Sequence, residues 1–228
     1  MTFSYDDGVL QDERFIEMLN KYGLLCTFNL NSGQFGNHDT LMAGDVELDH
    51  SHIPPERIRS LYDGHEVAAH SRNHPRLDLL DFDGLMDEIG GDVKCIEELS
   101  GQKVIGMAYP GGPFYNDFTI KTITENTDII YSRNVNSTGK FDLPEPDKLM
   151  EWCPTCHLRD GNTDELARQF AEAEPENDIL FYLWGHTYEF DLGNVWDNID
   201  RQLRVISEIP DITPATNGEI AVYVKKYK

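Results

Sequence analysis

Short apolar runs alternate with amphipathic runs along the whole sequence, and this alternation constrains the fold more than any other feature. Amphipathic runs with helical spacing lie between the apolar ones, as in chains built from βα units. Seven or eight strands in such alternation predict a barrel-like α/β fold, which we expect to form a single domain over residues 1–228. The predicted strands are 2–5, 24–31, 65–70, 103–110, 128–135, 147–152, 178–186 and 219–226. The predicted helices are 12–23, 54–64, 81–101, 116–126, 162–175 and 194–209.

The charge balance excludes two classes of partner. Nineteen basic residues against forty-one acidic ones give a formal net charge of −22, which argues against binding to nucleic acid or to an anionic membrane. No apolar run has the length of a transmembrane helix, and no signal-peptide pattern precedes the first strand. We therefore expect a cytoplasmic protein. The sequence does not indicate its oligomeric state.

The positions of the four cysteines do not indicate a disulfide framework. Cys26 and Cys95 lie in apolar-periodic segments and are expected to be small core residues. The string WCPTCH contains Cys153, Cys156 and His157 in the spacing of a haem c attachment site, but that chemistry requires export. A reduced structural pair is the favoured interpretation.

Chemically active side chains follow several of the predicted strands. In a barrel of parallel strands the carboxyl ends share one face, so residues at these ends are expected to meet in one site. The residues concerned are Asp6 and Asp7 after the first strand, His70 and His74 after the third, the glycine turn of YPGGP after the fourth, and His186 at the end of 178–186.

The string HSRNH places His70 and His74 four residues apart, which suits two ligands of one metal ion. Either Asp6 or Asp7 would complete a site of two histidines and one carboxylate, and the other would serve as a base. His186 would supply the acid that protonates a leaving group. The alternatives are a surface turn for HSRNH and a backbone-bonded histidine for His186.

Four strings together resemble the polysaccharide deacetylases, also called carbohydrate esterase family four or the NodB-homology group. TFSYDDG resembles the first motif of that family, GHEVAAHSRNHPRL the second, AYPGG a divergent third and LWGHTYEF the fifth. The resemblance extends from residue 2 to about residue 190.

The resemblance implies a distorted (β/α) barrel that holds one divalent metal ion, zinc first and otherwise cobalt or nickel. It implies a hydrolase that removes an acetyl group from an N- or O-acetylated sugar or glycan. Its metal ligands would be Asp7, His70 and His74. The remaining roles would be the general base for Asp6, the general acid for His186, an oxyanion donor near Tyr109 and Gly111, and a wall of the acetyl pocket for Trp184.

Two motifs of the family are incomplete here. The arginine that anchors the catalytic aspartate is replaced by Met107-Ala108, and Arg133 on the next strand is the candidate substitute. The aspartate and tryptophan of the fourth motif are not recognisable around YSRNVNSTG, so the group that orients His186 is left open.

Three other functions remain as alternatives. An allantoinase-like amide or cyclic-amide hydrolase would use the same fold, and a non-haem iron oxygenase would use the same ligand types. A glycan-binding relative without activity is the third. The segment 31–55 is expected to be a long loop, with His38, His50 and His52 exposed to solvent. Glu189 is expected either to bond sugar hydroxyls or to be solvated.

Overall fold

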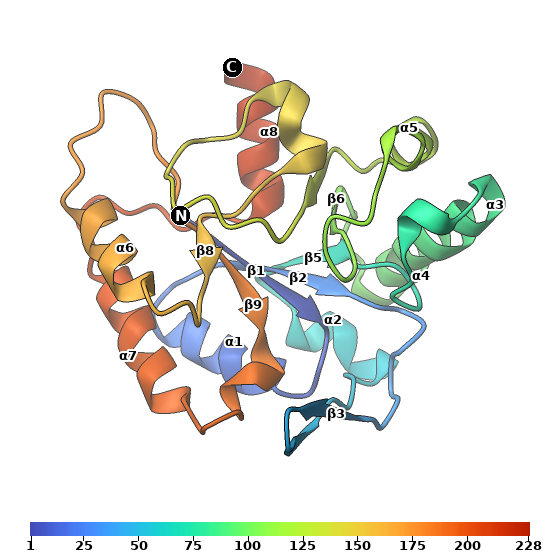
Figure 1. Ribbon diagram of the computed structural model, residues 1–228, viewed down its shortest axis with the longest axis horizontal. Helices are drawn as coiled ribbons and strands as arrows, with labels where there is room; N and C mark the ends of the chain where they lie inside the picture. The colour runs from blue at the N-terminus through green and yellow to red at the C-terminus, as the bar shows by residue number, and fades with distance from the viewer.

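One parallel sheet forms the centre of the computed structural model, which describes all residues from 1 to 228. Its seven strands run in the order β7-β6-β5-β2-β1-β9-β8 (Figure 1). Their bounds are β1 (Thr2–Asp7), β2 (Cys26–Leu30), β5 (Glu66–Ala69), β6 (Gly106–Ala108), β7 (Tyr131–Arg133), β8 (Cys156–His157) and β9 (Tyr182–His186). Trp152 forms a parallel bridge to Arg133 of β7, four residues before β8 begins, so one short segment links the two edges of the sheet. The predicted distorted α/β barrel is confirmed, with seven strands.

The alternation of residues along β1 separates the outside of the sheet from the inside. Phe3 and Tyr5 point outward and pack against Phe15 of the first helix, with ring centroids 6.4 and 4.3 Å apart. Ser4 and Asp6 point to the opposite, inner face. The helices are α1 (Asp12–Lys21), α2 (Ile58–Leu61), α3 (Phe82–Leu85), α4 (Gly91–Ser100), α5 (Asp117–Asn126), α6 (Thr163–Ala171), α7 (Trp196–Ser207) and α8 (Asn217–Tyr227). The predicted helix 81–101 is thus divided into α3 and α4, which a π-helical segment at Met86–Gly90 joins.

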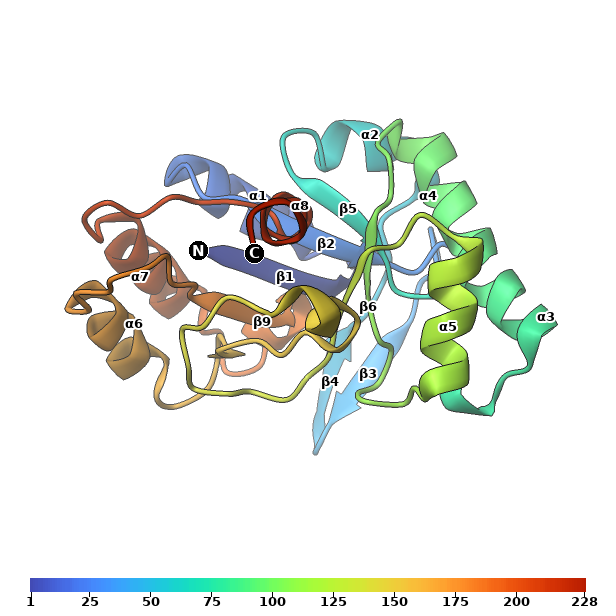
Figure 2. The ribbon, with the colours of Figure 1, turned by 90° about the horizontal axis from the view of Figure 1, so that it is seen from above.

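The C-terminal segment 219–226, predicted to be a strand, is helix α8. Thr216 and Glu219 form a capping box at its start, and Ile220 and Val224 are buried one turn apart. The β-branched residues suggested a strand, but the spacing of the buried positions is helical. Helix α8 closes the amino end of the barrel, and Figure 2 shows it end-on beside the start of β1.

The predicted strand 147–152 is also wrong. Pro146–Glu151 form a 3₁₀ helix, and the strand of this region is the two-residue β8 further along the chain. A proline at the first position favours a helical turn, and Leu149 and Trp152, three residues apart, both pack into the core beside Tyr131.

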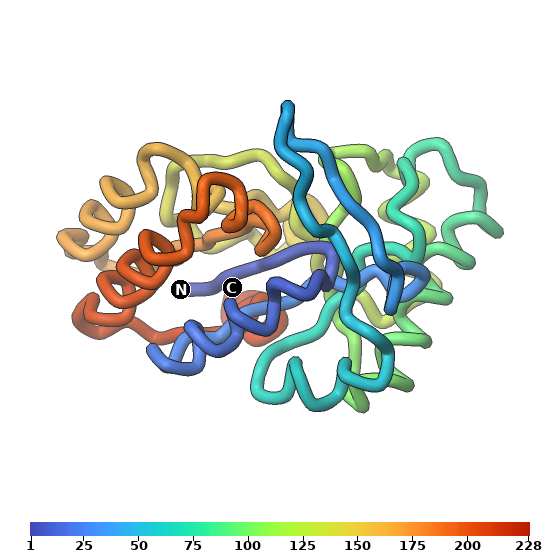
Figure 3. The backbone as a smooth tube through the Cα atoms, turned by 90° about the horizontal axis from the view of Figure 1, so that it is seen from below, coloured from blue at the N-terminus to red at the C-terminus, as the bar shows by residue number.

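The segment 31–55 is not the structureless loop that the sequence suggested. It contains a two-stranded antiparallel hairpin of β3 (Thr40–Ala43) and β4 (Val46–Asp49), which projects from the body of the molecule (Figure 3). Separately, none of the helices is both long and apolar enough to cross a bilayer.

Candidate active site

The carboxyl ends of two strands, β1 and β5, bring the candidate metal ligands together. Ligand atoms of Asp7, His70 and His74 all lie within 4.8 Å of one another. Oδ1 of Asp7 is 3.7 Å from Nε2 of His70 and 4.0 Å from Nε2 of His74. His186, at the end of β9, points its Nε2 to within 3.8 Å of Oδ2 of Asp6. These five side chains therefore form one cluster at the carboxyl end of the barrel.

The hydrogen bond of His70 makes this cluster suitable for a metal ion. Nδ1 of His70 lies 2.9 Å from the carbonyl oxygen of Ala108, which can only accept, so Nδ1 carries the proton. The lone pair of Nε2 is then free and faces Asp7. Two imidazoles and one carboxylate match the donor set of Zn²⁺ and related divalent ions, so the residues fit the ion that the sequence implied.

Three residues of this cluster adopt a backbone conformation that L-residues rarely use. Asp7, Ser71 and His74 have φ of 78°, 60° and 58°. Such strain persists where the surroundings enforce it, and Nδ2 of Asn31 does so by donating to the carbonyls of His70 and Ser71 at 2.6 and 2.7 Å. The unusual backbone turns the ligating side chains toward each other.

Asp6 is a buried carboxylate with two strong partners. Arg133 contacts its Oδ2, and Nδ2 of Asn29 donates to its Oδ1 at 2.8 Å. Burial by itself would raise the pKa of Asp6, but the positive charges of Arg133 and His186 outweigh it and lower the pKa below its ordinary value. Arg133 thus stands beside Asp6, where the sequence suggested a substitute for the missing arginine.

Glu189 lies between two histidines. Its Oε1 is 3.3 Å from Nδ1 of His186, and its Oε2 is 2.9 Å from Nε2 of His157. Burial would lower the pKa of His186, but Glu189 and the two aspartates raise it to about 9, while the histidines lower the pKa of Glu189 to about 2. Both ring nitrogens of His186 are therefore protonated at neutral pH. Glu189 accepts the Nδ1–H, so that Nε2 faces the cluster.

His157, His186 and Glu189 also have ligand atoms within 4.8 Å of one another, but their protons do not suit a metal ion. The backbone N–H of Arg159 donates to Nδ1 of His157 at 3.2 Å, so Nε2, which lies 2.9 Å from Oε2 of Glu189, is a ring nitrogen that carries a proton. A metal ion would need the lone pair of that nitrogen. This second cluster consequently holds protons, whereas the first offers free lone pairs.

Comparison with protein families agrees with this geometry. The family model described as polysaccharide deacetylase matches residues 1–128, more than half of the 228 residues. The chain belongs to the polysaccharide deacetylase family. Among curated proteins, none matches the chain.

Solved structures of polysaccharide deacetylase relatives share the fold at low sequence identity. The Xyl-CE4 domain of a multidomain xylanase from the hindgut metagenome of Trinervitermes trinervoides is 16% identical, with a TM-score of 0.60 over 97% of this chain and 89% of that one. A family 4 carbohydrate esterase from Streptomyces lividans, solved with acetate, is 17% identical, with a TM-score of 0.56 over 92% and 86%. A CE4 family pseudoenzyme from Bacillus anthracis is 17% identical, with a TM-score of 0.58 over 97% and 65%, so this chain spans about two thirds of its length.

Two further residues that the deacetylase resemblance implied differ in what they can offer a substrate. Tyr109 uses its N–H on the carbonyl of Arg133 and its hydroxyl on that of Met150, so it has no free donor. Gly111 has φ of 68°, lies beside His74 and donates its N–H to no protein acceptor. The expected oxyanion donor is therefore Gly111 and not Tyr109.

Trp184 lies inside the barrel, below the candidate active site. The guanidinium of Arg133 sits 4.6 Å from its ring centroid, and His157 packs edge-on against it at 4.8 Å. Its indole nitrogen is buried without a hydrogen-bond partner. Trp184 therefore supports the charged groups and also leaves one donor that faces no protein acceptor.

Two expectations about histidines outside the motifs were wrong. His50 is only partly exposed and its Nε2 lies 3.3 Å from Oδ2 of Asp7, while His52 is buried and bridges to Val9. Only His38 is exposed, as expected. The positions of His50 and His157 depend on chain segments brought together by tertiary structure, whereas Glu189 follows His186 by three residues. For His157 the sequence signal was the WCPTCH string, whose histidine matters here rather than its cysteines.

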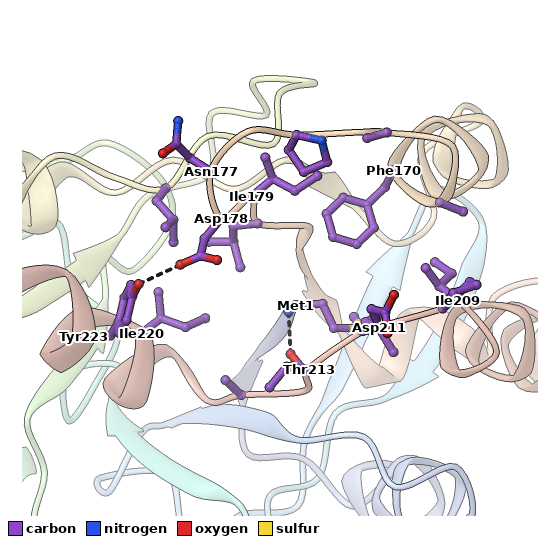
Figure 4. A pocket seen from close by; sticks show the side chains of 18 of the residues that line it. Met1, Phe170, Asn177, Asp178, Ile179, Ile209, Asp211, Thr213, Ile220 and Tyr223 are labelled. Carbon is purple, nitrogen blue, oxygen red and sulfur yellow. Dashed lines mark hydrogen bonds between the residues drawn. The ribbon is translucent and has the colours of Figure 1, made fainter. Parts of the chain in front are cut away.

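The cysteines are all free, with Cys156 buried and Cys153 partly so. A cavity of about 790 Å³ lies elsewhere, at the amino end of β1, lined by Met1, Phe170 and Ile209 among others (Figure 4). In this cavity the terminal ammonium group of Met1 donates a hydrogen bond to the carbonyl oxygen of Thr213. This cavity is far from the carboxyl ends of the strands and is separate from the candidate active site.

Proposed function

We propose that this chain is a metal-dependent deacetylase that hydrolyses the acetyl group of an N- or O-acetylated sugar or glycan. The observation that carries the proposal is the arrangement of Asp6 and His186 beside the cluster of Asp7, His70 and His74. Asp6 has Arg133 as its charged partner, and His186 has Glu189. A carboxylate kept ionised and an imidazole kept protonated are the base and acid that acyl transfer needs.

Asp7, His70 and His74 would hold one divalent cation, with zinc the first choice and cobalt or nickel also compatible with the ligands. When bound, such an ion supplies Lewis acidity toward the acetyl carbonyl and toward water.

Asp6 and His186 would carry out the two proton transfers of the reaction. Asp6, ionised because of Arg133, would accept the proton of the attacking water. His186 would donate the proton on Nε2 to the departing amine or alcohol, while Glu189 keeps hold of Nδ1–H. The free N–H of Gly111 would stabilise the negative charge that develops on the acetyl oxygen.

The relatives support a substrate that carries an acetyl group. The Streptomyces lividans esterase was solved in complex with acetate, the product of deacetylation. The Bacillus anthracis relative is a pseudoenzyme, so the fold alone does not establish activity. Retention of both Asp6 and His186 favours catalysis here, because a structural metal site would need neither.

The test is metal content of the purified protein together with acetate release from a panel of N- and O-acetylated sugars, with and without chelator. Asp6→Asn serves as the matched control, since it leaves the proposed ligands in place. About one ion per chain and chelator-sensitive acetate release that Asp6→Asn loses would support the proposal. Bound metal without acetate release would direct the search to amide or cyclic-amide substrates, and the absence of any metal binding would refute the mechanism.

A further inference from the structure

The two carboxylate oxygens of Asp7 face different partners. Oδ1 faces His70 and His74, at 3.7 and 4.0 Å from their Nε2 atoms. Oδ2 faces Nε2 of His50, at 3.3 Å. An ionised carboxylate can only accept, so the proton of this contact belongs to His50. His50 therefore holds the oxygen of Asp7 that is turned away from the other two ligands.

The ring of His50 is fixed by its neighbours. It packs edge-on against the rings of Tyr188 and His52, each with a centroid distance of 4.9 Å. Tyr188 lies two residues after the acid His186, in the turn that follows β9, so His50 contacts both halves of the site. Its backbone N–H donates to the carbonyl of Asp39 at the base of the β3–β4 hairpin, at 2.9 Å.

The segment that carries His50 is bonded to the turn that follows Asp7. Leu10 donates its N–H to the carbonyl of Ser51 at 2.8 Å, and Ile53 donates to the carbonyl of Gly8 at 2.9 Å. These bonds lie on either side of the Val9–His52 bridge. The chain from His50 to Ile53 thus runs along the turn that gives Asp7 its strained backbone, and holds both together.

We propose that His50 is the positioning residue of Asp7: its Nε2–H fixes Oδ2 so that Oδ1 is presented to the cation with His70 and His74. The segment 31–55 then brings a third histidine to the metal centre from outside the sequence motifs of the ligands. Hydrogen bonds to ligating groups commonly contribute 10- to 100-fold to metal affinity, about the effect expected here. This inference rests on the metal site of the proposed function.

A direct ligand role for His50 is the competing explanation, and the variants separate the two. The amide nitrogen of a glutamine occupies roughly the place of histidine Nε2 and donates a proton, but glutamine is a poor ligand for zinc. His50→Gln should therefore preserve a positioning contact and lose a coordinate bond. His50→Ala removes both. His38→Ala, which removes an exposed histidine from the same segment, is the matched control.

The experiment measures the affinity of each purified, metal-stripped protein for Zn²⁺ by competition with a chromophoric chelator, and records the visible spectrum of the Co²⁺ forms. Expected are an affinity about 10- to 100-fold weaker for His50→Ala, near wild type for His50→Gln, and unchanged for His38→Ala. The Co²⁺ spectrum should keep the wild-type band positions in all three. Circular dichroism and thermal denaturation of the metal-free proteins establish that each variant is folded.

Three other results would overturn the inference, in distinguishable ways. Wild-type affinity in His50→Ala would mean that the contact with Asp7 has no effect on the ion. Equal weakening in His50→Ala and His50→Gln, with shifted Co²⁺ bands, would make His50 a ligand instead of a positioning residue. Failure of the wild-type protein to bind Zn²⁺ would remove the proposed function, and this inference with it.

Discussion

The guanidinium of Arg133, on β7, contacts Oδ2 of Asp6, on β1, although β6, β5 and β2 lie between these strands in the sheet. The contact is possible because the sheet curls and both side chains point into its interior. Both side chains are almost completely shielded from solvent, with 0% and 3% of their surfaces exposed. A buried ion pair of this kind is costly to break, because removing one partner leaves the other charge without compensation.

Arg133→Met is expected to lower the free energy of unfolding by about 3–5 kcal/mol, since Asp6 would stay buried without its cation. Asp6→Asn should also lower the free energy of unfolding, because Arg133 would then be the buried charge without a partner. The double variant should be more stable than the sum of the two losses implies, because neither charge remains. Urea denaturation of the four metal-free proteins measures the coupling. Strictly additive losses would show that the two side chains do not act as a pair.

Substitutions of the adjacent residues Asp6 and Asp7 should affect metal binding and turnover differently. Asp6→Asn is expected to retain the ion and to lose about 10²- to 10⁴-fold in kcat, because the base is removed while the three proposed ligands stay in place. Asp7→Ala and His70→Ala should lose the ion as well as the activity. Metal analysis beside acetate-release kinetics makes the comparison. Undiminished turnover in Asp6→Asn would exclude it as the base.

The partner of the acid is testable through the leaving group. Glu189→Gln keeps the size of the side chain but removes the charge that raises the pKa of His186, so the protonated form of His186 should be lost at a lower pH. The alkaline limb of the kcat/KM profile should move to lower pH. The decrease in kcat/KM caused by Glu189→Gln should be larger for an N-acetyl substrate than for an activated acetyl ester, whose leaving group needs no proton. Equal losses on both substrates would contradict the role of Glu189.

The same pair makes the stability of the metal-free protein depend on pH. The pKa of Glu189 falls from 4.5 to about 2 on folding, so its contribution is present above pH 4.5 and is lost as the pH falls toward 2. The pKa of His186 rises from 6.5 to about 9, so its contribution is present below pH 6.5 and is lost as the pH rises through 9. The excess stability of wild type over Glu189→Gln should therefore be largest between pH 4.5 and 6.5. Thermal denaturation across the pH range measures it, and parallel profiles would refute it.

The sequence predicted the strand-end residues well because their placement is a local property. Asp6, Asp7, His70 and His186 each stand at the end of an apolar run, and parallel topology then places such ends on one face. The partners of these residues were harder to predict. Arg133 acts across the barrel, so its contact with Asp6 depends on how strongly the sheet curls. Glu189 is only three residues from His186, but their contact depends on the 3₁₀ turn Thr187–Phe190 that follows β9.

Predictions failed where local propensity and tertiary packing disagree. His50 lies 43 residues from Asp7 along the chain, in a segment with loop composition, and only the backbone bonds between residues 8–10 and 51–53 bring it to the site. The run 219–226 contains enough β-branched and aromatic residues to suggest a strand. It forms a helix because one face of it is buried against the barrel.

Helix α8 offers the last test, at the end of the barrel away from the site. Asn217, fully buried, accepts from the hydroxyl of Thr2 at 2.9 Å and donates from Nδ2 to the hydroxyl oxygen of Tyr182 at 2.6 Å. Asn217→Ala would remove this partner of the Thr2 hydroxyl and leave the Tyr182 hydroxyl with Ser4 alone, at about 1–3 kcal/mol in all. Asn198→Ala, on the exposed side of α7, is the control and should change stability little.

Urea denaturation compares these two variants, with kcat measured on each folded protein. The Asn217 variant should unfold at clearly lower urea but keep wild-type kcat, because its bonds lie at the amino ends of β1 and β9 while the chemistry lies at their carboxyl ends. If it proved as stable as the Asn198 variant, the polar contacts would not be what attaches α8 to the barrel. The attachment would then rest on its apolar residues Ile220, Ala221 and Val224.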